Sequence, residues 1–247
     1  MLTLLRLLLI LAILPTSSAL AAIVCGSATT STTEADPQTV TFSPDAGSNR
    51  IVIVAGSMRD STNPTNTVNG VSSSGGGTWT QYALDANAGS PPARSYIYYS
   101  TNFTSGSQTI SIDYTIASPT QGTVGVFTCT GVDTASPWRA TRTTASGSGT
   151  SGSMNVSSAL GDVVIDVLSL SGSTGDALTI GAGQTSKFNL SNGGVNLIAG
   201  SSTEDGAATV TMSWSWANSR PWVSVGGSLK EAVIAAVTRN RGAVILP

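Results

Sequence analysis

The 247-residue chain contains no histidine, and this removes much of the side-chain chemistry on which enzymes rely. Ser-His-Asp and Cys-His nucleophile systems need an imidazole base, and histidine is also a frequent zinc ligand. The two cysteines, Cys25 and Cys129, are too few for a structural zinc site. The remaining route to catalysis is a pair of carboxylates, as in glycoside hydrolases, whose two acids stand about 5 to 10 Å apart.

The acidic residues form no convincing pair of this kind. The candidates are Glu34 in the N-terminal segment, the adjacent Glu204 and Asp205 in a predicted turn, Glu231 at the start of the tail, and Asp113 and Asp166 within predicted strands. Asp166 interrupts an apolar run, but a lone aspartate on an outer or edge face of a strand is the simpler explanation. The acids also lack the dense spacing of a calcium loop. We therefore predict no enzyme activity, no cofactor and no metal site.

Aromatic residues are the better candidates for binding, because sugars stack their C–H faces on flat rings. In the predicted strand that starts at Arg94, alternation puts Arg94, Tyr96 and Tyr98 on the face opposite Ile97. If Ile97 faces the core, Tyr96 and Tyr98 form an exposed pair. The candidate ligand-binding residues are therefore Arg94, Tyr96, Tyr98 and Trp138, the last in a connecting loop. Packing between strands is the alternative role for these rings.

The strands that must position these residues come in two similar sets. The alternating segment 106–117 is repeated at 206–217. Further pairs follow in the same order: 39–42 with 153–156, 50–54 with 162–166, and 123–126 with 222–225. Short segments rich in Val, Ile, Thr and aromatics, with Gly, Ser, Asn and Pro between them, predict an all-β chain. Antiparallel pairing is expected, because no crossover helices are available.

Two architectures fit this repeat. We expect one antiparallel, jelly-roll-like β-sandwich over residues 22–230, with interleaved strands from two sequence-similar halves, about 22–132 and 139–230. Two small sandwiches in tandem are the alternative. The apolar segments 51–55 and 163–168 should lie centrally, and the alternating strands should face water on one side.

The N-terminus indicates export. Residues 1–21 carry a short charged region, an apolar run over 7–14 and the Ala19-Leu20-Ala21 cleavage signal of a signal peptide. The run is shorter than the roughly 20 residues of a membrane-spanning helix, so no membrane span is expected after cleavage. We expect a secreted or cell-surface protein. There, Cys25 and Cys129 could be joined in a disulfide; equally, Cys129 could be a buried thiol and Cys25 part of a frayed end.

Charge excludes one class of partner. Charged residues make up 10% of the chain, and its two lysines, Lys187 and Lys230, provide no basic stripe for phosphates. Nucleic-acid binding is therefore not expected. Residues 231–247 have no counterpart in the first half; they are expected to be a disordered tail or, alternatively, a segment that docks on another subunit or on the cell surface.

One stretch resembles a known group of domains. The run from Thr128 to Pro137, with Gly131-Val132-Asp133 inside it, resembles a junction in jelly-roll-like β-sandwich domains of bacterial secreted and phage-associated surface proteins, and segments 161–164 and 222–229 match as well. The resemblance implies an exported surface module without an assigned activity. We therefore expect a non-enzymatic extracellular or cell-surface structural or interaction module, able to assemble with itself through a sheet edge or the tail. A carbohydrate-binding or adhesion module that recognises surface glycans is the alternative, and a paired-carboxylate glycoside hydrolase comes last.

Overall fold

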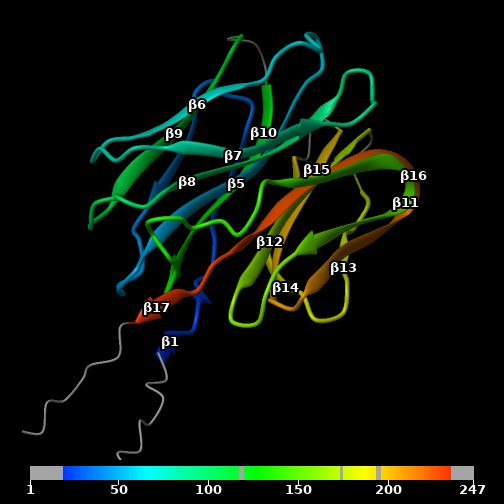
Figure 1. Cartoon of the computed structure of the whole chain (residues 1–247). Helices are drawn as coiled ribbons and strands as arrows, with labels where there is room; N and C mark the ends of the chain where they lie inside the picture. The colour runs from blue at the N-terminus through cyan, green and yellow to red at the C-terminus, as the bar shows by residue number, and fades with distance from the viewer. Residues whose placement is uncertain (1–18, 117–119, 173–174, 193–195, 235–247) are drawn as a thin grey trace, which may run out of the picture.

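The computed structural model describes residues 19–116, 120–172, 175–192 and 196–234. Within these ranges the regular secondary structure consists of β-strands without any helix, and every strand pairing is antiparallel. The predicted all-β, sandwich-like fold is confirmed (Figure 1).

The first half consists of one large sheet covered on one face by a small sheet. The large sheet has the order β2 (Val24–Cys25) and β3 (Thr29–Thr33) on one edge, then β10 (Thr120–Thr130), β5 (Ile51–Asp60), β8 (Ala93–Ser100) and β7 (Thr80–Ala86). The small sheet has the order β4 (Gln38–Phe42), β9 (Gln108–Tyr114) and β6 (Val68–Ser73). A buried apolar cluster fills the space between them.

The second half repeats this strand order. Its sheet runs β11 (Thr143–Ser157), β16 (Thr209–Leu229), β12 (Val163–Ser171), β15 (Leu197–Asp205) and β14 (Thr185–Asn192), and β13 (Thr179–Ile180) pairs with β16. The long β16 corresponds to both β9 and β10 of the first half. Its first part pairs with residues 151–157 and with β13, and its second part pairs with β12 and residues 143–149. Segments that match in the sequence thus lie at corresponding positions in the two halves.

The two halves pack through their large sheets. A central cluster combines residues of the first half, such as Ile53 and Ile97, with residues of the second, such as Ile165 and Val225. β5 and β12 lie in the interior of their sheets and are buried along their whole length, as their apolar sequences predict. The alternating strand β9 is buried only at every second residue, apart from partly buried Ser111, so its outer face meets solvent.

The strands of the two halves are not interleaved, which differs from the arrangement that we expected. Each large sheet takes all of its strands from one half, and only the short pair β1 (Ala19–Ala21) and β17 (Ala232–Ile234) joins segments from the two ends of the described chain. The expectation rested on each half having too few strands for two layers. The strands are sufficient, because the small sheet of the first half and the first part of β16 in the second provide the missing layers.

Candidate functional site

The predicted exposed pair, Tyr96 and Tyr98, is buried, so that prediction of exposure is wrong. Tyr96 is 0% exposed and Tyr98 5%, and their rings pack edge to face with centroids 6.2 Å apart. Both faces of β8 are covered, because Ile97 packs into the central cluster while the two tyrosines face the small sheet. Burial raises the pKa of both phenols. The alternative role in packing is the one that their contacts support.

Arg94 lies on the same side of β8 and holds a loop in place. Its Nε donates to the carbonyl oxygen of Asn66 at 2.8 Å, and its Nη2 donates to that of Pro64 at 3.1 Å. Burial lowers the pKa of this guanidinium. Arg94 therefore fixes the chain just before β6.

Trp138 belongs to an aromatic cluster at the junction of the two halves. Its indole stacks on Tyr82 of β7, with centroids 3.7 Å apart and planes 8° from parallel, and meets Tyr99 of β8 edge to face at 5.8 Å. The Tyr82 hydroxyl also donates to the carbonyl oxygen of Ala140 at 3.2 Å. Because Trp138 precedes the second sheet while both tyrosines belong to the first, these three residues, the junction aromatic cluster, tie the halves together.

Beside this cluster, Tyr99 lines a pocket of about 240 Å³. The other lining residues are Thr78, Thr80, Thr101, Asn102, Thr134, Ala135 and Pro137. The Asn102 side chain is ordered by two bonds to its oxygen, from the Thr78 amide at 2.8 Å and the Ser100 hydroxyl at 3.0 Å. Tyr99 is not among the predicted binding residues, because alternation places it on the presumed core face of β8. That face meets the segment that joins the two halves, which alternation within a single strand cannot reveal.

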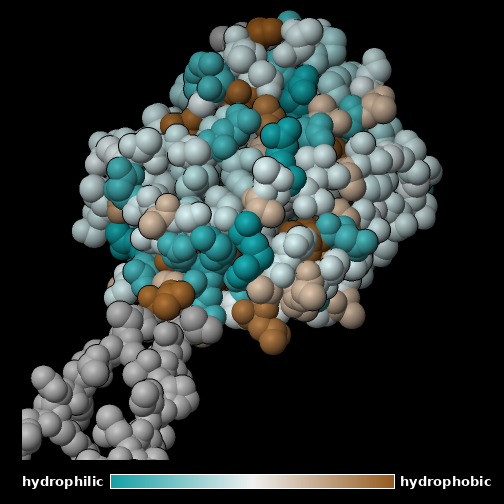
Figure 2. All heavy atoms as spheres, in the orientation of Figure 1, coloured by the Kyte–Doolittle hydropathy of each residue, from teal (hydrophilic) through white to brown (hydrophobic). Residues whose placement is uncertain are grey.

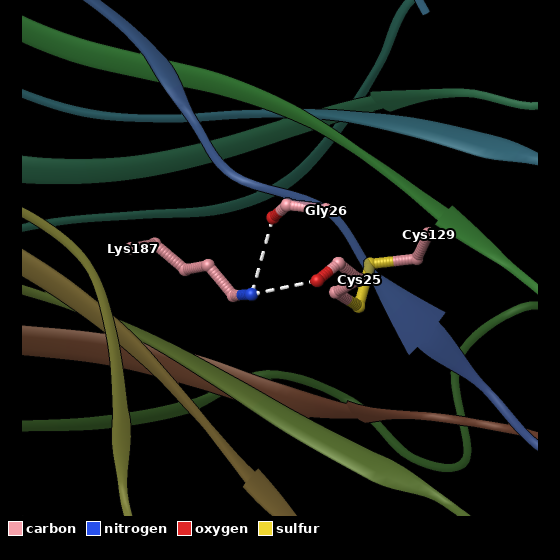
Figure 3. The surroundings of a disulfide bond; sticks show 4 residues. All are labelled: Cys25, Gly26, Cys129 and Lys187. Carbon is pink, nitrogen blue, oxygen red and sulfur yellow. Dashed lines mark hydrogen bonds between the residues drawn. A yellow bond between two sulfur atoms is a disulfide. The ribbon is translucent and has the colours of Figure 1, made fainter. Parts of the chain in front are cut away.

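Cys25 and Cys129 form a disulfide (Figure 3). The two residues are direct partners in the β2–β10 pairing, with Cα atoms 4.0 Å apart. Lys187 of β14 approaches from the second half, and its ammonium donates to the carbonyl oxygens of Cys25 at 2.9 Å and Gly26 at 3.1 Å. Partial burial lowers the pKa of this lysine. The disulfide segment thus also lies at the contact between the halves.

The two strand aspartates lie in different halves and in opposite environments. Asp113 is exposed on the outer face of β9, where it accepts a bond from the Asn69 amide at 2.5 Å. Asp166 is fully buried, so its predicted place on an outer or edge face is wrong. β12 lies between the central cluster and the first part of β16, and the Asp166 side chain turns toward Trp214 of that part. The structure therefore does not bring these two acids together.

No family model, curated protein or solved structure was found to match this chain. The resemblance to bacterial surface domains thus remains an expectation. Within the described ranges, no three or more Asp, Glu, Cys or His side chains gather in a way that could hold a metal ion. Among the same residues, no helix has the length and apolar character needed to cross a membrane.

Proposed function

We propose that this chain is a non-enzymatic extracellular structural and interaction module in which two sandwiches act as one unit. The observation that carries the proposal is the central cluster, whose 14 buried residues come from both halves. A large apolar interface of this kind restricts relative motion between neighbouring units, whereas small polar interfaces permit it. The two halves therefore form one scaffold rather than two units that move relative to each other.

The sheet edges support binding through side chains rather than through added strands. The edge strands β7 and β14 each contain a register shift, between Gln81 and Ala83 and between Ser186 and Phe188. On β3, the carbonyls of Ser31 and Thr33 accept bonds from the side chains of Gln38 and Asn192. Irregular or capped edges resist pairing with another chain. We therefore favour a module that does not assemble through these edges.

The described surface presents few large apolar side chains to a partner. Among residues of described burial, the large apolar side chains that are well exposed are Val24, Leu160 and Val233. The face in Figure 2 is mostly pale or teal, with separate brown spots rather than a continuous apolar area. A partner that approaches this face would therefore meet mainly polar groups. The disulfide supports an oxidising compartment, since such bonds are rare in the cytosol.

Light scattering after size exclusion, combined with calorimetry, tests this proposal on the chain from Ala22 onward. We expect the mass of one chain at all concentrations and a single unfolding transition, because the halves share a core. Concentration-dependent assembly would contradict the argument from the edges. Two separate transitions would contradict the argument from the shared cluster.

Glycan binding is the second candidate, and the observation that favours it is the pocket beside Tyr99. An aromatic ring, an ordered amide and several threonine hydroxyls surround this pocket, and such a mixture suits a sugar. A glycan array with the wild type, Tyr99→Ala and Tyr98→Phe tests it. We expect a signal that is lost in Tyr99→Ala and retained in Tyr98→Phe, whose ring faces the opposite side of β8. The absence of a wild-type signal, or a signal that Tyr99→Ala retains, would remove this assignment.

A further inference from the structure

The contact between the two large sheets changes from apolar to polar along its length. On β5, the side chains that face the second half are Ile51, Ile53, Ala55, Ser57 and Arg59, and on β12 those that face the first half are Ile165, Val167, Ser169 and Ser171. The first members of each series belong to the central cluster. The last members form a buried polar region at one end of the same contact.

Hydrogen bonds between the halves fill most of this polar region. The hydroxyl of Ser169 lies 2.5 Å from that of Ser57 and 2.5 Å from that of Ser95. The Ser95 hydroxyl also lies 3.2 Å from the carbonyl oxygen of Val223, to which it can donate. All three serines are 0% exposed, so these hydrogen bonds satisfy hydroxyl groups that water does not reach.

Asn87 closes the polar region and uses its whole bonding capacity. Its Nδ2 donates to the Ser171 hydroxyl and to the carbonyl oxygen of Pro221, both at 3.1 Å. Its Oδ1 accepts from the amides of Gly89 and Ala93, both at 3.0 Å. Asn87 thereby folds the 89–91 loop against the second half and shapes one wall of a pocket.

Arg59 is the exception in this well-bonded region. It is only 8% exposed, and its Nε donates to the Pro91 carbonyl oxygen at 3.3 Å. Its Nη1 is buried and has no hydrogen-bond partner within the described structure. Burial lowers the pKa of the guanidinium, which remains charged at neutral pH. A buried charged nitrogen without a partner is costly, so it points to a group that the described residues do not supply.

The pocket at Arg59 has a volume of about 200 Å³ and is formed by both halves. Its lining residues are Arg59, Gly89, Ser90, Pro91, Ser171, Gly172, Ser219, Arg220 and Pro221. Two of these nine residues are arginines and none is acidic. The Ser171 hydroxyl accepts its bond from Asn87, which leaves its own proton available for donation.

Arg59 forms no ion pair with the described residues, and two acids of neighbouring segments are bonded elsewhere. Asp60 follows it on β5 and so faces the other side of the sheet, where it accepts bonds from Asn66 at 2.9 Å and Thr62 at 2.8 Å. Asp176 is paired with the second arginine, Arg220, through Nε at 3.0 Å. The lining therefore keeps a local positive charge in a chain whose formal net charge is −2.

We propose that this pocket binds a small oxyanionic group, a carboxylate or a sulfate, with Arg59 as its main ligand and Arg220 and Ser171 beside it. The planar guanidinium fork matches two oxygens of such a group, and a charge-assisted pair of this kind is strong where water is partly excluded. The volume is below that of pockets for drug-sized molecules, so it fits a single group or one terminal residue of a larger ligand.

Titration calorimetry on the chain from Ala22 onward tests the proposal with sodium glucuronate and sodium sulfate as probes, and with glucose as the neutral control, at constant ionic strength. We expect saturable one-to-one binding of an anion and none of glucose. The stronger of the two anions identifies the ligand as planar or tetrahedral. Arg59→Met should weaken binding by about tenfold or more, the loss expected for one charged hydrogen bond. Arg142→Met removes an exposed arginine outside the lining and should leave the affinity unchanged.

A thermal measurement separates a ligand site from a structural arginine. Without anions, Arg59→Met should be at least as stable as the wild type, because it removes an uncompensated buried charge. Sulfate should raise the melting temperature of the wild type more than chloride does at equal ionic strength, and this difference should shrink in Arg59→Lys, which keeps the charge without the fork. Wild-type protein that shows no saturable anion binding, or an affinity unchanged in both Arg59 variants, would overturn the proposal.

Discussion

The indole Nε1 of Trp214 donates a hydrogen bond to Oδ2 of Asp166 at 2.6 Å, inside the second sandwich. The other carboxylate oxygen accepts from the amide of Ser202 at 3.0 Å and from its hydroxyl at 2.6 Å. In the first half the corresponding aromatic side chain bonds to a neutral group, because the Tyr114 hydroxyl donates to Gln38 Oε1 at 2.7 Å. Tyr114 and Trp214 occupy equivalent places in the sequence repeat, and the side chain that accepts the hydrogen bond of the aromatic residue is a neutral amide in the first half and a carboxyl group in the second.

This carboxyl group should make the protein more stable in mild acid. Complete burial raises the pKa of Asp166 to about 6, although its hydrogen bonds act in the opposite direction. A raised folded-state pKa gives stability that is present below the unfolded value and is lost as pH rises through the folded value. We expect the free energy of unfolding to fall by up to about 3 kcal/mol between pH 4 and pH 7.5, at about 1.4 kcal/mol for each pKa unit.

Asp166→Asn is the matched variant for this pH effect, because it keeps the shape and removes the titration. Urea denaturation at several pH values should give a much flatter profile for Asp166→Asn over the same range. Burial also raises the pKa of Glu204, so Glu204→Gln serves as the control for the remaining slope. An identical pH profile for the wild type and Asp166→Asn would contradict this account.

At lower pH, Asp162 should act in the opposite sense. Burial alone would raise its pKa, but hydrogen bonds from Arg139 and Ser228, with the charge of Arg139, outweigh burial and lower it. A lowered folded-state pKa gives stability that is present above the unfolded value and lost as pH falls below about 4. Asp162→Asn should cost about 1–2 kcal/mol at pH 7, since Arg139 is partly exposed, and should show a shallower loss below pH 4. Acid titration followed by circular dichroism checks both, and an unaltered acid midpoint in the variant would count against it.

The junction aromatic cluster should contribute measurably to stability. Trp138→Ala removes the ring that stacks on Tyr82, and we expect the free energy of unfolding to fall by about 2–3 kcal/mol for this half-buried residue. Trp138→Phe retains an aromatic ring and removes an indole nitrogen that is buried without a partner in the described structure, so it should cost less than 1 kcal/mol or so. Chemical denaturation of both variants measures the difference. Equal stability of the Ala and Phe variants would show that the stack contributes nothing.

Reduction of the disulfide should destabilise the protein strongly. Cys25 and Cys129 are 104 residues apart, and a bond that closes so long a loop contributes about 2–5 kcal/mol. Denaturation with and without a phosphine reductant measures this contribution in the wild type. Cys25→Ala provides the control, because its stability should match that of the reduced wild type and should not respond to reductant.

The sequence predicted the strands well because the alternation of apolar and polar residues reports burial along a single strand. The sequence pattern therefore identifies β5 and β12 as central strands and β9 as a strand with one solvent-exposed face. Alternation does not say what covers each face. Tyr96 and Tyr98 were expected to be exposed because one covered face was assumed for β8, whereas β8 has two.

The sequence contains a pattern that marks the proposed anion pocket, but this pattern can be recognised only when the packing of the two halves is known. Ser57 and Arg59 continue the apolar face of β5, and Ser169 and Ser171 continue that of β12, so both strands become polar at the same end. Within one strand, this looks like the approach of a solvent-exposed terminus. Once the two faces are packed together, the same residues become buried partners, and Arg59 keeps one nitrogen that no described residue pairs with.

The position of the disulfide determines what a single proteolytic cut does to the molecule. Cys25 and Cys129 enclose nearly the whole first half, from β3 to most of β10. One peptide-bond cut anywhere between them, for instance in the turn after Ser73, leaves both fragments covalently joined. A nicked molecule would thus keep its full mass until it is reduced, and its sheets could stay paired around the break.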